Sequence, residues 1–466
     1  MLRKMCTTAI AAAGIGLLLG ASDAGAQKIR VPHATRTTLA NGLTVIVMPY
    51  TKVPVVHLRL VVRGGSAQDP EGLEGTASIM TSLMREGTTS RTGREIAEQI
   101  DFIGGTLYCG AGLDYCAVRC EVLGKDLTTG LDLFADIVMH PAFPADELDR
   151  EIKQRRAELE GLKEDPEALA NRAFVSHVYG DHAYGRSATG TRASLDEITR
   201  ASVRDFYESV FTPSRSTLVL VGDVDPADAM EKLTAAFGGW AGEADSLPAV
   251  PAPVRRTGRT VILVDKPDAT QTQVIIGNTG VDRRNPDCDA IDVANTIFGG
   301  AFTSRLVDVL RVQRSLTYVV GSGFGTHLAG GLFAIATFTK NETVREIIDG
   351  ILEQLRLFRS KGATAMELVK GRNYLAGEFA RGLQSPQALA GDITDIELFG
   401  LPPTWLETHI QKLQGVTLEN VRHVAGKYFP RDEDMVVVVV GPAADLAPVL
   451  ASYGDVTTLT LDDVVR

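Results

Sequence analysis

The sequence predicts an α+β fold of two similar domains, each a mainly antiparallel sheet with helices packed on one face, which face each other across a cleft. Two observations predict it. A succession of helix and strand patterns occurs twice along the 466-residue chain. Within each copy, turn-like segments such as 110–114 join strands as hairpins, whereas long helical patterns such as 145–162 and 344–358 separate others. Ligand sites are common where two such domains meet.

The repeat has a period of about 220 residues, which is too long for a solenoid. Residues 195–213 have the pattern of a helix that stops at an aromatic residue and a proline. A β-branched strand, a Val-Gly turn and another helix follow. The same succession recurs from residue 413 onward. The starts of the copies match as well, because 42–47 resembles 258–263.

The junction between the copies predicts where the domains end. Residues 238–257 contain several prolines and an acidic stretch but neither a helical nor a strand period. Such a composition is typical of a stiffened linker. We therefore expect a first domain at about 35–240, a linker at 241–254 and a second domain at about 255–460.

The segment 1–26 predicts a secretory signal peptide. Two basic residues precede the apolar run 9–19, and Ala24-Gly25-Ala26 is a small-residue cleavage site. We expect cleavage before Gln27 and a periplasmic or secreted mature chain. A membrane anchor is the alternative, but the apolar run is too short to span a bilayer comfortably.

The net charge of −11 and the lack of a basic stretch argue against nucleic acid and anionic lipid as partners. No apolar run after the first 26 residues is long enough to cross a membrane, so we expect no membrane partner. Cys109 and Cys116 flank a turn-like segment, where a hairpin could place them opposite each other. Either a disulfide or two buried free thiols fits this pattern.

The segment 75–88, GTASIMTSLMREGT, follows a strand pattern that ends in Arg-Gly-Gly-Ser at 63–66. It resembles the metal-binding helix of the pitrilysin/insulinase family of zinc peptidases, which normally carries the inverted zinc motif His-x-x-Glu-His. Further matching pieces are Gly104-Gly105 before a hairpin, an acidic helix that ends at 164–166, and Tyr-Gly-Arg at 184–186. The resemblance covers nearly all of the mature chain, and the order and spacing of the pieces make it specific.

The three motif positions fall on Ser78, Thr81 and Ser82, and the family's later glutamate ligand matches Glu158. In an intact motif two imidazoles on one helical face bind zinc, and the glutamate activates the metal-bound water. Hydroxyl groups are poor zinc ligands and cannot act as the base. The zinc motif is therefore degenerate. We expect no metal or other cofactor bound by this chain, and a polar helix face that lines an empty groove.

The second domain retains the opposite half of the family's active site. The segment 302–321, FTSRLVDVLRVQRSLTYVVG, resembles the family segment in which a helix carries an arginine and the next strand a tyrosine seven residues later. The matching residues are Arg311 and Tyr318. The resemblance implies that the arginine holds the substrate backbone and that the tyrosine hydroxyl stabilises the tetrahedral intermediate. Both roles suit the chemistry of a guanidinium and a phenol. A surface arginine and a core tyrosine are the alternative.

The hairpin of the first domain resembles the family's substrate strand, to which an extended peptide adds through backbone hydrogen bonds. The matching residues are Gly105, Thr106, Leu107, Tyr108, Cys109, Gly110 and Ala111.

A degenerate zinc motif together with a retained Arg–Tyr pair predicts the non-catalytic, substrate-binding subunit of a heterodimeric zinc metallopeptidase that degrades peptides. Zinc is expected in a homologous partner subunit, to whose site this chain supplies Arg311 and Tyr318. The chain is then inactive without that partner. A catalytically inactive peptide-binding or scaffold protein of the same fold is the alternative.

Overall fold

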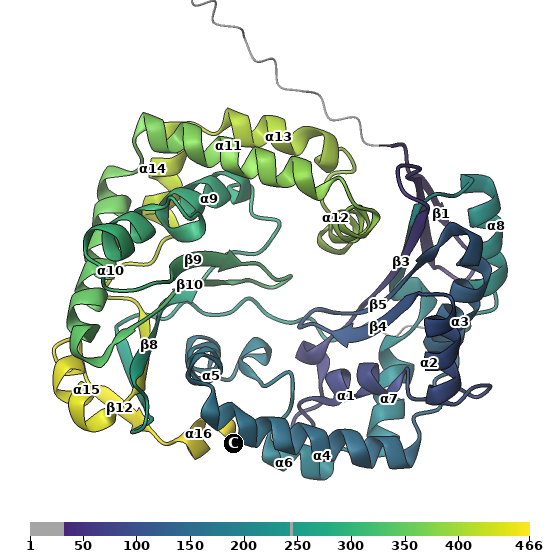
Figure 1. Cartoon of the computed structure of the whole chain (residues 1–466), viewed down its shortest axis with the longest axis horizontal. Coiled ribbons are helices and arrows are strands. Elements are labelled where there is room, and N and C mark those ends of the chain that lie inside the picture. The colour runs from purple at the N-terminus through teal and green to yellow at the C-terminus, as the bar shows by residue number, and fades with distance from the viewer. Residues whose placement is uncertain (1–31, 243–245) are drawn as a thin grey trace, which may run out of the picture.

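Two six-stranded sheets, each with its own hydrophobic core, organise the chain. The computed structural model describes residues 32–242 and 246–466, so the predicted signal peptide at 1–26 lies outside the described residues. Figure 1 shows the two sheets on opposite sides of the molecule. Within the described ranges, no helix is both long and apolar enough to cross a membrane.

The first sheet has the strand order β1-β2-β6-β3-β5-β4, and the second has the order β12-β7-β11-β8-β10-β9. The strands of the first sheet are β1 (Thr35–Thr38), β2 (Thr44–Pro49), β3 (Val55–Arg63), β4 (Thr106–Ala111), β5 (Tyr115–Leu123) and β6 (Ser216–Gly222). Those of the second sheet are β7 (Thr260–Asp265), β8 (Gln271–Thr279), β9 (Val320–Gly325), β10 (Leu332–Lys340), β11 (Val436–Gly441) and β12 (Val456–Leu459).

The two sheets repeat one topology. β2 and β6 run parallel, and so do their counterparts β7 and β11. The strands β6, β3, β5 and β4 pair antiparallel in turn, as do β11, β8, β10 and β9. The sheets differ at one edge, because β1 runs antiparallel to β2 whereas β12 runs parallel to β7. The α+β fold of two similar, mainly antiparallel domains is therefore confirmed; the domain boundaries remain a prediction.

Helices cover the outer face of each sheet (Figure 1). The helices of the first half are α1 (Thr76–Leu83), α2 (Gly93–Phe102), α3 (Leu127–Met139), α4 (Ala145–Gly161), α5 (Pro166–Tyr179), α6 (Arg192–Glu197), α7 (Arg200–Val210) and α8 (Pro226–Phe237). Those of the second half are α9 (Cys288–Asn295), α10 (Val344–Lys361), α11 (Ala365–Gly382), α12 (Pro386–Phe399), α13 (Trp405–Gly415), α14 (Leu418–Lys427), α15 (Ala443–Leu450) and α16 (Leu461–Val465). Two π-helical segments, Thr296–Gly300 and Val307–Gln313, follow α9.

The inner face of each sheet is covered by a helix from the opposite half, which the sequence did not predict. Phe174 of α5 lies in one buried cluster with Val438 of the second sheet. Ile393 of α12 lies in one buried cluster with Val219 of the first sheet. The fit is close, because a Cβ at Gly277 of β8 would lie 2.8 Å from Cζ of Phe174. Figure 1 shows these two helices lying between the sheets.

A polar contact between two hairpin turns also joins the halves. Asp114, in the turn between β4 and β5, accepts a hydrogen bond from the hydroxyl of Tyr184. It also accepts one at 2.9 Å from the backbone N–H of Leu328, in the turn between β9 and β10. The backbone N–H of Ala329 donates to the Tyr184 hydroxyl at 3.1 Å. The tips of the two sheets are thus held together.

The register between β4 and β5 decides the state of the cysteines. Cys116 lies opposite Ala111, and Cys109 lies opposite Val118, so Cys109 and Cys116 are not cross-strand partners. Both are buried free thiols. Burial raises the pKa of the Cys109 thiol to about 12, so this thiol is inert near neutral pH.

Phe174→Ala tests the crossed packing of α5. Because this side chain is 2% exposed, its loss should lower the free energy of unfolding by about 3–5 kcal/mol. Denaturant unfolding followed by circular dichroism measures the change. Phe102→Ala is the matched control, since Phe102 is 91% exposed and its loss should cost less than about 0.5 kcal/mol. Equal effects of the two substitutions would contradict the packing described.

Candidate functional site

α1 carries the degenerate zinc motif, and Asp69 fixes its first turn. Asp69 follows β3 and is only 3% exposed. Its carboxylate oxygens accept hydrogen bonds from the backbone N–H groups of Gly75 and Ala77, each at 2.8 Å. Glycine is required at Gly75, where φ is +96° and a Cβ would lie 2.8 Å from the backbone nitrogen of Gly190. The position of α1 is therefore set by its N-terminal contacts.

The three hydroxyl residues of the motif differ in their surroundings. Thr81 is 1% exposed, and its hydroxyl lies 3.0 Å from the carbonyl oxygens of both Ala77 and Ser78, to which it donates. Ser78 and Ser82 are half-buried. The predicted polar face therefore consists of Ser78 and Ser82, because Thr81 is buried and its hydroxyl is satisfied within its own helix.

The groove beside Ser82 is not empty, because Arg155 of α4 reaches it. Nη2 of Arg155 donates to Oγ of Ser82 at 3.1 Å, and Nε donates to Glu151 at 2.9 Å. Nη1 lies 3.6 Å from an Oε of Glu158. The side chains of Arg155 and Glu151 are 15% and 16% exposed, and that of Glu158 is 51% exposed. The predicted third-ligand position is thus paired with an arginine.

These residues do not fit a zinc ion. Ser78 and Ser82 offer neutral hydroxyls where zinc prefers imidazole, thiolate or carboxylate. The guanidinium of Arg155 adds a permanent positive charge beside Glu158. Across residues 32–242 and 246–466, no group of three or more His, Cys, Asp and Glu side chains is arranged to hold a metal ion.

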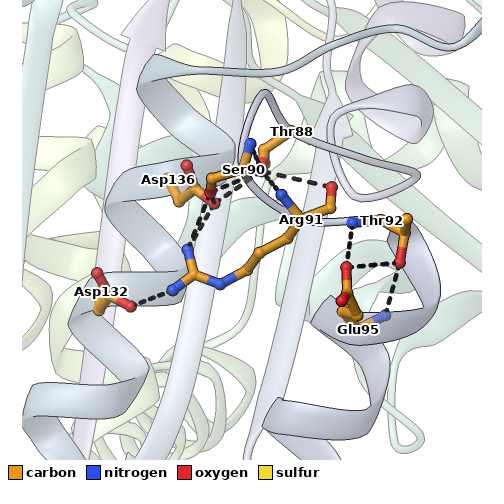
Figure 2. A network of polar contacts seen from close by, with 7 residues as sticks. All are labelled: Thr88, Ser90, Arg91, Thr92, Glu95, Asp132 and Asp136. Carbon is orange, nitrogen blue, oxygen red and sulfur yellow. Dashed lines mark hydrogen bonds and ion pairs between the residues drawn. The ribbon is translucent and has the colours of Figure 1, made fainter.

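A polar network fixes the segment that leaves α1, as Figure 2 shows. Asp136 of α3 accepts hydrogen bonds from Thr88 at 2.7 Å, Ser90 at 2.8 Å and Arg91 at 2.6 Å. Arg91 also donates to Asp132 at 2.5 Å. Burial acts to raise the pKa of Asp136, but the hydrogen bonds outweigh it and the pKa is lowered. This network, which no sequence motif indicated, ties the segment after α1 to α3 in the outer layer of helices.

β4, which matches the family's substrate strand, lies at the edge of the first sheet. The predicted segment 105–111 contains all of this strand. No described strand pairs with its outer side, so backbone groups there can pair with an added peptide strand. Arg85 of the turn after α1 donates to the carbonyl of Leu107 at 3.0 Å. The Tyr108 ring is 48% exposed and lies 4.3 Å from the Arg119 guanidinium carbon.

Arg311 and Tyr318 lie in the second half, close to β9. Arg311 belongs to the π-helical segment Val307–Gln313, and its guanidinium carbon lies 4.8 Å from the centre of the Phe302 ring. Tyr318 was predicted to lie on the strand that follows the helix. This prediction is wrong, because Tyr318 precedes β9 by two residues. Its side chain is 76% exposed, so it is not a core tyrosine. Among the described residues, neither the Arg311 nor the Tyr318 side chain has a hydrogen-bond or ion-pair partner.

The backbone on either side of Tyr318 is held in place. Oγ1 of Thr317 accepts from the backbone N–H of Val319 at 3.1 Å. Oγ1 of Thr337, on β10, donates to the Val319 carbonyl at 2.8 Å. The carbonyl of Leu316 accepts from Thr339 at 2.7 Å. The backbone next to Tyr318 is thus held in place, while its phenol is exposed.

Two family models match the chain. The Insulinase (Peptidase family M16) model matches residues 45–192, and the Peptidase M16 inactive domain model matches residues 197–375. The chain is 27% identical to an uncharacterized zinc protease of Mycobacterium leprae over 84% of this chain and 88% of that protein. It is 23% identical to the uncharacterized zinc protease YmxG of Bacillus subtilis over 88% of this chain and 99% of that protein.

Solved structures share the fold. The peptidase M16 inactive domain of Pseudomonas fluorescens superposes with a TM-score of 0.83 at 27% identity, and the match covers 88% of this chain and 98% of that one. A protease of Helicobacter pylori superposes with a TM-score of 0.80 at 20% identity over 89% of this chain and all of that chain.

Asp69→Asn tests the support of α1. Burial raises the pKa of Asp69 to about 7, from 3.8. Between these values the folded chain binds more protons than the unfolded chain, so stability falls as the pH rises from about 4 to 7, by on the order of 3 kcal/mol. The substitution should remove this part of the pH dependence, measured by urea unfolding at several pH values. Glu71→Gln, an exposed carboxylate in the same loop, is the control. An unchanged pH dependence in Asp69→Asn would contradict the assignment.

Proposed function

This chain belongs to the pitrilysin/insulinase (M16) family of peptidases, and we propose that it is the non-catalytic, substrate-binding subunit of a heterodimeric zinc metallopeptidase that degrades peptides. Its partner would be a homologous subunit with an intact zinc motif. This chain would supply Arg311 and Tyr318 to the partner's site.

One contrast carries the proposal. At the motif positions, Thr81 is buried and Ser82 is hydrogen-bonded to Arg155, so these positions offer no zinc ligand. In the second half, Arg311 and Tyr318 keep side chains that have no hydrogen-bond partner among the described residues, and hydrogen bonds hold the backbone next to Tyr318. Side chains of this kind are available to a ligand or to another subunit.

The chemistry of the two side chains suits a peptide undergoing hydrolysis. The carbonyl oxygen of the scissile bond gains negative charge when water attacks its carbon. A phenol O–H and a guanidinium placed near that oxygen stabilise the charge, and the guanidinium also holds the backbone in one orientation. These groups need a metal-bearing site opposite them, and in this proposal the partner provides it.

The edge strand β4 supports a role in substrate binding. An extended peptide can add to its free side through backbone hydrogen bonds, which select for extended conformation more than for sequence. The exposed Tyr108 and the half-buried Gly110 and Ala111 would line that strand. We further propose that the mature chain acts in the periplasm or outside the cell, after cleavage before Gln27.

Reconstitution with the partner subunit tests the proposal. The purified chain should hold no zinc by mass spectrometry and cleave no peptide, whereas the mixture should cleave a quenched fluorescent peptide. Tyr318→Phe should lower kcat of the mixture by roughly 10²–10³-fold because one oxyanion donor is lost. Arg311→Ala should lower kcat/KM, with part of the loss in KM.

Arg314→Ala is the matched control, because Arg314 lies three residues from Arg311 but is paired with Glu353 at 2.6 Å. It should leave kcat and KM within about twofold of the unsubstituted mixture. Peptidase activity of the chain alone would refute the proposal. Formation of the heterodimer with no effect of Arg311→Ala or Tyr318→Phe would instead favour an inactive peptide-binding or scaffold protein.

A further inference from the structure

We propose that Arg155 takes the place of the metal ion in this chain. Its guanidinium is a built-in cation that joins Ser82 on α1 to Glu151 and Glu158 on α4. The remnant of the zinc site is thereby held in a form that excludes divalent cations. This inference concerns the isolated chain, so it does not depend on the proposed heterodimer.

The geometry of α4 places the three charged groups on one face. Glu151 precedes Arg155 by four residues and Glu158 follows it by three, and residues at these spacings are neighbours on a helix surface. The guanidinium uses all three of its nitrogens. Nε contacts Glu151, Nη1 faces Glu158, and Nη2 crosses to Oγ of Ser82. Ser82 is the second metal-ligand position of the motif and Glu158 the third, so the guanidinium stands between two former ligand positions.

The contact between Arg155 and Glu151 is more buried than an ordinary ion pair on a helix surface. The side chains of Arg155 and Glu151 are both about 85% buried. The next residue offers a comparison within the same helix. Arg156 pairs with Asp196, but both of these side chains are at least half exposed. Such an exposed pair contributes little, whereas removing one partner of a buried pair leaves an uncompensated charge.

The charges also explain why the site excludes zinc. A divalent cation beside Glu158 would lie within a few ångströms of the guanidinium, whose charge cannot be removed at accessible pH. Like charges at that separation repel strongly in a half-buried groove. Restoring the three motif residues alone should therefore give a poor zinc site, and a good site should require the removal of Arg155 as well.

The first experiment rebuilds the motif with and without the arginine. Ser78→His, Thr81→Glu and Ser82→His are combined in one chain, and a second chain carries Arg155→Ala in addition. Zinc affinity is measured by competition with a chromophoric chelator. The fourfold variant should bind one zinc at least roughly 10-fold more tightly than the threefold variant, the range typical of changes beside metal ligands.

Arg156→Ala added to the threefold variant is the matched control, and it should leave zinc affinity unchanged. If the threefold variant binds zinc as tightly as the fourfold variant, Arg155 does not block the site and the proposal fails. It also fails if Arg156→Ala improves zinc binding as much as Arg155→Ala does.

A second measurement does not require the rebuilt motif to fold. In the otherwise unchanged chain, Arg155→Gln should lower the Tm by roughly 2–6 °C, because α1 and α4 lose their link and two carboxylates lose their counter-ion. Arg156→Gln should lower it by much less. Equal shifts for the two substitutions would show that Arg155 is an ordinary surface arginine and would overturn the proposal.

Discussion

The structure depends on the burial of both faces of each sheet. Every residue of β11, from Val436 to Gly441, is buried, and such a strand is stable only where apolar layers lie above and below it. The helices of each half cover one face only. The other face is covered by the helix that the opposite half extends, α5 on the second sheet and α12 on the first. Neither sheet can complete its packing alone, so this exchange fixes the two halves relative to each other.

Duplication and exchange together explain why the functional features fall into two sets. β4 and β9 occupy the same edge position in their sheets, and α1 and α9 follow equivalent strands. The first copy carries the degenerate metal motif and the edge strand β4, which we propose binds the peptide. The second carries Arg311 and Tyr318 just before its edge strand. The two copies thus carry different side chains at equivalent places in one topology.

Local patterns predicted much of this, because helices, strands and their repeat leave a periodic signal in the sequence. The helices at 145–162 and 344–358 correspond to α4 (Ala145–Gly161) and α10 (Val344–Lys361). Contacts between residues distant in sequence could not be predicted. The exchange of α5 and α12 is one example, and the two-residue offset that separates Cys109 from Cys116 is another. The helix that carries Arg311 is a π-helix. It differs from an α-helix in its backbone hydrogen bonds, and the residue composition of the segment does not show that difference. The spacing of Glu151, Arg155 and Glu158 can be read from the sequence. Their link to Ser82 could not be predicted, because it depends on where α1 lies relative to α4.

In our proposal, Arg155 also balances the charges around the degenerate metal motif. Glu151 and Glu158 remain on one face of α4, and without a cation two negative charges would share a partly buried groove. Such charges are costly unless they are paired. A guanidinium on the intervening residue pairs with both, and its third nitrogen donates to the hydroxyl of Ser82, where an intact motif has histidine. The pairing of Arg155 with these two carboxylates also affects how a zinc site could be regained. A zinc ion held by restored motif residues would meet the positive charge of Arg155, so in this proposal a good zinc site also requires the loss of Arg155. In the proposed arrangement, Arg155 therefore links α1 to α4 and supplies the counter-charge for Glu151 and Glu158.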